Sequence, residues 1–153
     1  MNSVSSPYFA SYYADNNLVE LKRLVRNSTI YMLLLAVPIF LVIVIFPSSI
    51  LSFFGEEYTA AKNGLIILAC AQLFNVATGP VYLLLRMTGH QRYLRNIVFA
   101  TTAISIISSF LLIPIYGFMG AVYSAALGLV LQNSGSYYYT KKFIGISIWS
   151  RKN

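Results

Sequence analysis

Four long blocks of apolar residues follow one another along the chain, separated by short polar stretches. Each block is close to the roughly 20 residues that an α-helix needs to cross about 30 Å of hydrocarbon. A soluble helix of this size would carry polar residues at nearly every turn, and these blocks do not. The pattern predicts an all-α membrane protein with a membrane domain over residues 29–140, whose four transmembrane helices cover about 29–46, 61–85, 97–113 and 118–138.

The segments that flank this domain are more polar. Residues 1–28 are predicted to form a cytoplasmic segment, and residues 141–153 a cytoplasmic basic tail. Within the first segment, residues 15–26 predict a short amphipathic helix that lies along the membrane surface, because its apolar residues share one face. That face carries Leu18, Leu21, Leu24 and Val25, opposite Glu20, Lys22, Arg23 and Arg26.

Two prolines set further expectations for the blocks. Proline has no backbone N–H and interrupts the hydrogen bonding of a helix interior. Gly79-Pro80 is therefore expected to interrupt the second helix, and the third helix is expected to stop at Pro114.

The basic residues are distributed unevenly among the loops. The net charge is +7, and of the eleven Lys and Arg residues only Lys62 falls in the loops after the first and third blocks. Cytoplasmic loops carry an excess of Lys and Arg, so both termini are predicted to be cytoplasmic. The ten residues on that side are Lys22, Arg23, Arg26, Arg86, Arg92, Arg95, Lys141, Lys142, Arg151 and Lys152.

Composition argues against several functions. Charged residues make up 10% of the chain, against about 25% in soluble proteins. The basic residues form short tracts rather than one patch, so nucleic acid is not an expected partner. Cys70 is the one cysteine and is expected to be a small buried apolar residue, which leaves no disulfide within the chain.

Residues that could perform catalysis are also missing from the pattern. His90 is the one histidine and has no carboxylate near it in sequence. The chain has no HExxH motif, no glycine-rich phosphate loop and no nucleophile paired with a base. We therefore expect no enzyme activity, no metal site and no cofactor. The four acids lie outside the apolar blocks: Asp15, Glu20, Glu56 and Glu57.

Polar side chains inside the blocks are more informative, since each must be hydrogen bonded or must line a cavity. In the second block Gln72 and Asn75 share one helical face, with Thr78 beside them. Gln132 and Asn133 lie in the fourth block. These residues predict either hydrogen bonds between helices or the wall of a water-filled path. All five are candidates for a substrate path.

Small and basic residues suggest two further roles. Gly120, Ser124 and Gly128 recur at intervals of four, which favours close packing of helix backbones. Arg86 lies in a cytoplasmic cluster with Arg92 and Arg95, which could contact lipid phosphates or an anionic substrate. Topology alone would also account for that cluster.

The order of several short motifs is similar to that of a known family. Phe54-Gly55-Glu56-Glu57-Tyr58 is followed by Ala71-Gln72-Leu73-Phe74-Asn75, Gly79-Pro80, Leu85-Arg86-Met87-Thr88-Gly89 and Ile113-Pro114-Ile115-Tyr116-Gly117. From about Pro7 to Lys142 the chain resembles the C-terminal part of bacterial polysaccharide biosynthesis membrane proteins. These are flippases for lipid-linked oligosaccharides such as O-antigen, within the multidrug/oligosaccharidyl-lipid/polysaccharide exporter superfamily.

The resemblance implies a larger protein. Such flippases have two helical lobes around a central cavity, so four helices would be part of one lobe. Expected partners are membrane lipid, a lipid-linked oligosaccharide, and an N-terminal lobe or other membrane subunit. The expected location is the bacterial cytoplasmic membrane, and the expected process is assembly of cell-surface polysaccharide, including lipopolysaccharide. Gln72, Asn75, Thr78, Gln132 and Asn133 would bond sugar hydroxyls, with Arg86 near a diphosphate.

Two alternatives stay open. A multidrug or cation antiporter of the same superfamily, or a small dimerising multidrug transporter, would be expected to carry a carboxylate inside the membrane, and these blocks contain none. A non-transporting structural membrane subunit would need no such group. Loss of surface polysaccharide, as opposed to altered drug resistance, would distinguish these functions.

Overall fold

The computed structural model describes residue 9 and residues 11–145. Residues 1–8, 10 and 146–153 lie outside the described part, including Arg151 and Lys152 of the predicted tail and the first residues of the predicted cytoplasmic segment. Every regular element that is described is helical, as predicted. The elements are α2 (Leu18–Ile45), α3 (Pro47–Ser52), the 3-10 helix η1 (Glu56–Ala61), α4 (Lys62–Ala77), α5 (Val81–Met87), α6 (Gln91–Tyr116) and α7 (Phe118–Ile144).

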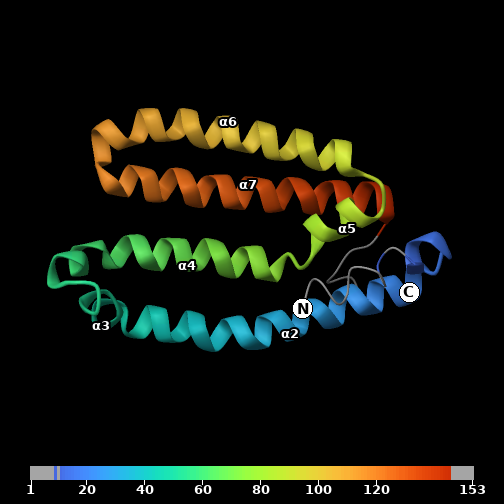
Figure 1. The fold of residues 1–153 in the computed structure, drawn as a ribbon, viewed down its shortest axis with the longest axis horizontal. Helices are drawn as coiled ribbons and strands as arrows, with labels where there is room; N and C mark the ends of the chain where they lie inside the picture. Colours follow the sequence, from blue (N-terminus) through green and yellow to red (C-terminus); the bar gives the residue numbers. More distant parts are fainter. Residues whose placement is uncertain (1–8, 10, 146–153) are drawn as a thin grey trace.

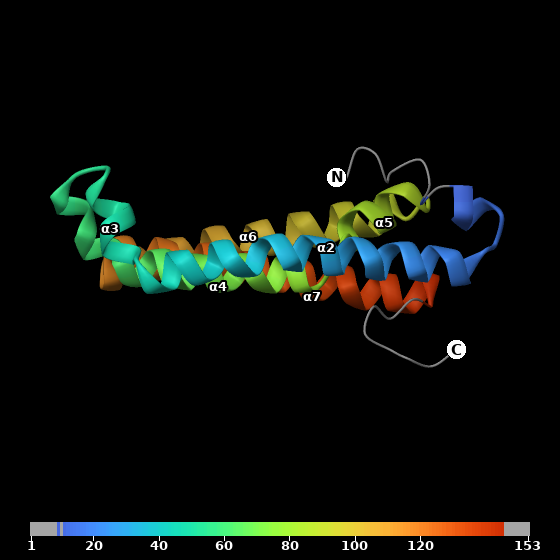
Figure 2. The ribbon, with the colours of Figure 1, turned by 90° about the horizontal axis from the view of Figure 1, so that it is seen from below.

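The four long helices lie side by side in a single layer, in the order α2, α4, α7, α6 (Figure 1). Seen at right angles, this layer is thin over most of its length (Figure 2). The short helix α5 packs on α6 and α7 at the end where α2 begins and α7 ends. Because the layer is one helix thick, most of the large apolar side chains of α2 and α6 are exposed on its faces.

Charge is sorted along the length of the layer. Nine of the eleven Lys and Arg residues are described, and eight of them lie near the end that holds α5, which we call the basic end. Lys62 lies at the opposite end, with Glu56 and Glu57. This sorting is what the predicted topology requires, while the side of the membrane that each end faces stays a prediction.

Three helical stretches in the described part are long and apolar enough to cross a membrane: Leu18–Ile45, Glu56–Ala77 and Gln91–Tyr116. The fourth predicted span corresponds to α7, which is 27 residues long but is not among them. Its second half contains Gln132, Asn133 and three serine or threonine residues, which lower its hydropathy. Three of these polar residues are buried, namely Asn133, Ser136 and Thr140, and so is Ser124 in the first half of the helix.

The structure corrects the start of the first span. The predicted surface helix over 15–26 and the predicted span over 29–46 are one continuous helix, α2, of 28 residues. Asn17 caps this helix by accepting a hydrogen bond from the Glu20 N–H at 3.2 Å. No glycine or proline follows until Pro38, and the Thr29 hydroxyl donates to the Val25 carbonyl at 2.8 Å. The helix therefore continues through the point where the sequence changes from polar to apolar residues.

The third and fourth spans also differ from their predicted bounds. α6 continues through Pro114 to Tyr116, although the sequence pattern predicted an end at Pro114. The proline removes only the hydrogen bond that its own N–H would donate, and the helix still closes after it, because the Gly117 N–H donates to the Ile113 carbonyl at 2.8 Å. Gly117 then turns the chain with a φ of +59°, a value that glycine adopts without steric cost. α7 continues beyond residue 138 to Ile144 and so includes Lys141 and Lys142.

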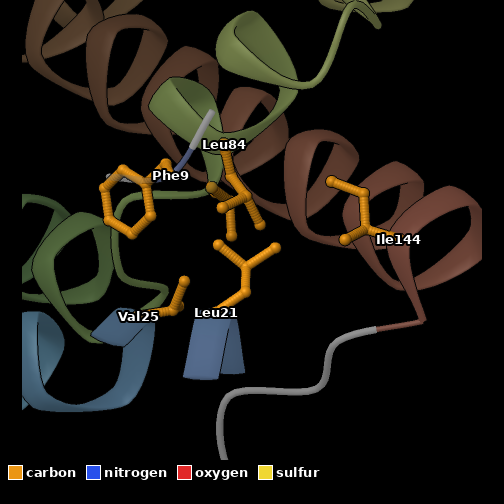
Figure 3. Close-up of a cluster of buried hydrophobic side chains, with 6 residues drawn as sticks. Phe9, Leu21, Val25, Leu84 and Ile144 are labelled. Atoms are coloured by element: carbon orange, nitrogen blue, oxygen red, sulfur yellow. The ribbon is translucent and has the colours of Figure 1, made fainter. Parts of the chain in front are cut away.

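The largest fully buried apolar side chains gather at the basic end. Phe9, Leu21, Leu84 and their neighbours form one cluster that joins the N-terminal segment to α2, α5 and α7 (Figure 3). We call it the basic-end cluster, and its buried members are Phe9, Leu21, Val25, Val81, Leu84 and Ile144. The middle of the layer has no comparable cluster among the described residues. Cys70, which was expected to be buried, is exposed on α4.

The contact between α6 and α7 is close. A Cβ atom added to Gly120 would overlap main-chain atoms of Leu112 and Ile113 on α6. Farther along, the Ser105 hydroxyl of α6 donates to the Ser124 carbonyl of α7 at 3.0 Å, and Gly128 packs against the same Ser105 side chain. The structure thus places all three predicted packing residues in this contact.

Candidate functional site

The helix break between α4 and α5 positions the main group of candidate residues. α4 ends at Ala77, and Thr78, Gly79 and Pro80 separate it from α5. Pro80 has no N–H to continue the hydrogen-bonding pattern, and Gly79 has a φ of +69°. The break lies beside α7, which packs on both α4 and α5. The predicted interruption at Gly79-Pro80 is therefore present in the structure.

Four polar residues connect α4 to α7 at this break. The Asn75 side-chain amide donates to Gln72 Oε1 at 3.0 Å, and the Thr78 hydroxyl donates to the Asn75 carbonyl at 2.8 Å. Thr78 Oγ1 is also 3.4 Å from Asn133 Oδ1, and Asn133 Nδ2 donates to the Leu129 carbonyl at 2.8 Å. We call Gln72, Asn75, Thr78 and Asn133 the amide row.

The side-chain oxygens of the amide row can accept further hydrogen bonds. Thr78 has one hydroxyl proton, which the shorter bond to the Asn75 carbonyl uses. The 3.4 Å contact to Asn133 Oδ1 is longer than a normal O–H···O bond. The row runs from Gln72, which is exposed, to Asn133, which is buried. An incoming hydroxyl group could therefore hydrogen bond to Gln72 first without breaking the contacts inside the layer.

An apolar groove adjoins the exposed end of the row. This groove has a volume of about 320 Å³ and lies between α2 and α4. Gln72 is its one polar side chain, and the others include Ile39, Phe40, Leu68 and Leu73. The site thus combines amide groups with an adjoining apolar wall. That combination suits a ligand with many hydroxyl groups and an apolar part.

Gln132 does not belong to the amide row, although it neighbours Asn133 in sequence. Its side chain lines a groove of about 240 Å³ between α6 and α7, with Thr101, Thr102 and Ser105. Adjacent residues on a helix point about 100° apart, which places the two amides in different surroundings. Thr101, Thr102 and Ser105 of α6 were not predicted as residues of a substrate path. Their spacing of three and four residues places them on one helical face, and this spacing could have indicated them.

Arg86 is also separate from the amide row. It lines a groove of about 400 Å³ between α5 and α6, and Arg95 lines the same groove. Arg92, the third arginine of the predicted cluster, does not line it. The structure therefore brings two of the three arginines together in a groove away from the amides.

A cluster of aromatic rings around His90 was not predicted from the sequence. The imidazole stacks on the Phe143 ring with centroids 5.0 Å apart, and its Nδ1 is 3.1 Å from the Thr88 hydroxyl. Tyr93 lies 4.5 Å from Phe143 and 5.5 Å from Tyr139, measured between ring centroids. Through these contacts the turn before α6 packs against the end of α7. Within the described residues, no three His, Cys, Asp or Glu side chains are placed to hold a metal ion.

Comparison with known proteins identifies the family. No solved structure matches the chain. The probable low-salt glycan biosynthesis flippase Agl15 of Haloferax volcanii is 23% identical over 141 residues, which cover 92% of this chain and 30% of that protein. The chain therefore spans about a third of the length of this curated relative. Residues 1–111 match the MatE family, and because this match covers most of the chain, the protein belongs to the MatE family of the multidrug/oligosaccharidyl-lipid/polysaccharide exporter superfamily.

Proposed function

We propose that the chain is part of a flippase that moves a lipid-linked oligosaccharide across the cytoplasmic membrane during cell-surface polysaccharide biosynthesis. The observation that carries this proposal is the amide row, an uncharged set of donors and acceptors at a helix break next to an apolar groove. Sugar hydroxyls both donate and accept hydrogen bonds, so side-chain amides suit them. Membership of the MatE family and the name of the Haloferax volcanii relative support the same function.

In this proposal the amide row binds sugar hydroxyls during the crossing. Gln72 makes the first contact, because it is the exposed member of the row. Asn75 and Asn133 follow, and Gln132 contributes from the groove between α6 and α7. The predicted contact between Arg86 and a diphosphate stays a prediction, since Arg86 lies in a different groove.

We further propose that α7 crosses the membrane as a fourth span. α7 lies between α4 and α6, both of which belong to candidate spans, and packs against both. At about 1.5 Å per residue its 27 residues measure about 40 Å. A helix that lies alongside two membrane-spanning helices must itself be at membrane depth. Both termini would then be cytoplasmic, at the basic end.

Cysteine labelling tests this topology. In a Cys70→Ser background, Tyr116→Cys places a thiol at the exposed turn between α6 and α7, and Lys141→Cys places one near the other end of α7. A membrane-impermeant maleimide added to intact cells should label Tyr116→Cys and leave Lys141→Cys unlabelled until the membrane is permeabilised. Equal labelling of both in intact cells would show that α7 does not cross.

The remainder of the transporter is also a proposal. The chain forms a layer one helix thick with exposed apolar faces, and alternating access needs two bundles that move against each other. We infer that a further lobe or membrane subunit completes the cavity. The amide row would then face this cavity rather than lipid.

Substitution of the amide row tests the proposed function. We expect the double change Gln72→Leu and Asn75→Leu to lower polysaccharide export about thirtyfold, because each of the two lost hydrogen bonds to substrate contributes about 1 kcal/mol. The measurement is surface polysaccharide in cells that depend on this gene, at equal protein level in the membrane. Asn63→Leu is the control, since it replaces a side-chain amide with leucine at the other end of α4.

The same assay separates the alternatives. Unchanged export with the double variant would contradict the proposed role of the row. An equal loss with Asn63→Leu would assign the effect to general damage to α4. A changed drug resistance with normal polysaccharide would favour an antiporter, whose coupling carboxylate would have to lie outside this chain's apolar blocks.

A further inference from the structure

A groove between α5 and α6 brings two arginines together at the basic end. Its volume is about 400 Å³, within the range of small-molecule sites. The turn that joins the two helices is held by local bonds: the Thr88 hydroxyl donates to the Leu84 carbonyl at 2.9 Å, and the His90 N–H donates to the Leu85 carbonyl at 3.0 Å. Gln91 Nε2 donates to the Arg86 carbonyl at 3.3 Å. The turn is thereby held in place, and Arg86 from α5 and Arg95 from α6 line one groove with exposed side chains.

Neither arginine is neutralised by a carboxylate in the described part. The ion pair found there joins Arg23 to Glu20 at 3.8 Å, and the remaining acids are Asp15, Glu56 and Glu57. The groove also lies at the N-terminal end of α6, where the helix dipole adds partial positive charge. Guanidinium groups bind phosphate through paired hydrogen bonds, so the groove complements a phosphate group.

The groove changes from polar to apolar along α6. Gln91 and Arg95 line it near the start of the helix, and Val98 and Phe99 line it one to two turns further on. Phe99 is exposed over 70% of its surface. From Gln91 to Thr102 the wall is about 16 Å long at 1.5 Å per residue. A ligand that fits this order has a phosphate at one end and a hydrocarbon chain at the other.

We propose that this groove binds an anionic phospholipid of the membrane leaflet at the basic end. The phosphate lies between Arg86 and Arg95, and an acyl chain follows Val98 and Phe99 along α6. α6 is the outermost helix of the layer on its side, so lipid reaches the groove from the surrounding bilayer. The groove and the amide row share no residue, so the proposal does not depend on how the amide row binds sugar.

The test measures lipid retention by the purified full chain. The protein is extracted in mild detergent, mixed with phosphatidylglycerol or phosphatidylcholine, and examined by native mass spectrometry. We expect a preference for phosphatidylglycerol that Arg95→Gln lowers about fivefold, in line with the contribution of one basic residue to anionic lipid binding. Arg92→Gln is the matched control, since it removes the same charge from the same helix outside the groove, and should change retention less than twofold.

Two further measurements distinguish a lipid from a free anion. Phe99→Gln changes only the apolar part of the groove and should lower phosphatidylglycerol retention, while inorganic pyrophosphate at the same concentration should not displace the lipid from the unchanged protein. Three results would overturn the proposal: equal losses with Arg92→Gln and Arg95→Gln, no preference for the anionic lipid, or displacement by pyrophosphate together with no effect of Phe99→Gln. If Arg95→Gln does not fold, the Phe99→Gln variant and the pyrophosphate measurement still test the proposal.

Discussion

Gly120→Ala is expected to destabilise the fold by about 3 kcal/mol, at the upper end of the usual cost of overpacking. The added Cβ would overlap main-chain atoms of Leu112 and Ile113 rather than a side chain. A side chain can change rotamer to relieve such a clash, but a helix backbone cannot. The clash therefore has to separate α6 from α7, whose contact includes the hydrogen bond from Ser105 to the Ser124 carbonyl.

Gly128→Ala provides the matched control on the same helix. Its new Cβ would lie 3.1 Å from the Ser105 hydroxyl oxygen, which can move by a few tenths of an ångström. Alanine also favours helix over glycine by up to about 1 kcal/mol, so the net effect at Gly128 should be within about 1 kcal/mol. The measurement is the free energy of unfolding in detergent micelles with added denaturant. Equal effects of the two substitutions would show that the approach at Gly120 is not the closest part of this contact.

The helices were predictable from the sequence because hydrocarbon imposes a length and a composition on any element that crosses it. Their ends were less predictable. Lys22, Arg23 and Arg26 marked the edge of the apolar block, but charged residues do not end a helix, and α2 includes all three. Pro114 similarly did not end α6, because it removes only the hydrogen bond of its own N–H, and the Gly117 N–H after it still donates to the Ile113 carbonyl.

The order of helices in the layer could not be predicted. In a soluble protein, an apolar stripe shows which face of a helix is buried. Helices in lipid are apolar on all sides, so their sequences show this only where small or polar residues occur. Gly120 and Ser124 indicated which face of α7 packs against a neighbouring helix, whereas no residue in the apolar part of α2 indicated its packing face.

The candidate site was partly predictable for the same reason. Gln72, Asn75 and Thr78 lie within two turns of one helix, so their proximity follows from helical spacing alone. The choice between Gln132 and Asn133 depended on the rotation of α7 against α4, and the structure places Asn133 beside Thr78. The pairing of Arg86 with Arg95 depended on the turn after α5, which no pattern in the sequence describes.

The second large effect is expected in the basic-end cluster. Leu84→Ala should lower the free energy of unfolding by about 3 kcal/mol, typical of a leucine removed from a packed site. Leu84 is fully buried, and the cluster around it joins four parts of the chain. Leu34→Ala on α2 makes the same change at a side chain that is 68% exposed, and should alter stability by less than about 0.5 kcal/mol.

The expected difference in stability loss between Leu84→Ala and Leu34→Ala follows from whether water or lipid surrounds each position. Under the proposed topology Leu34 contacts lipid, and a leucine that leaves lipid for another apolar surface gains little. Under the same topology the basic-end cluster lies at the membrane surface, where water is present, so its burial would gain the full hydrophobic contribution of about 25 cal/mol per Å². Thermal unfolding in lipid nanodiscs measures both variants under one condition. Equal losses would mean that the basic-end cluster stabilises the fold no more than the apolar part of the layer does, whereas the expected difference would mean that packing in this cluster, which includes Phe9, contributes more.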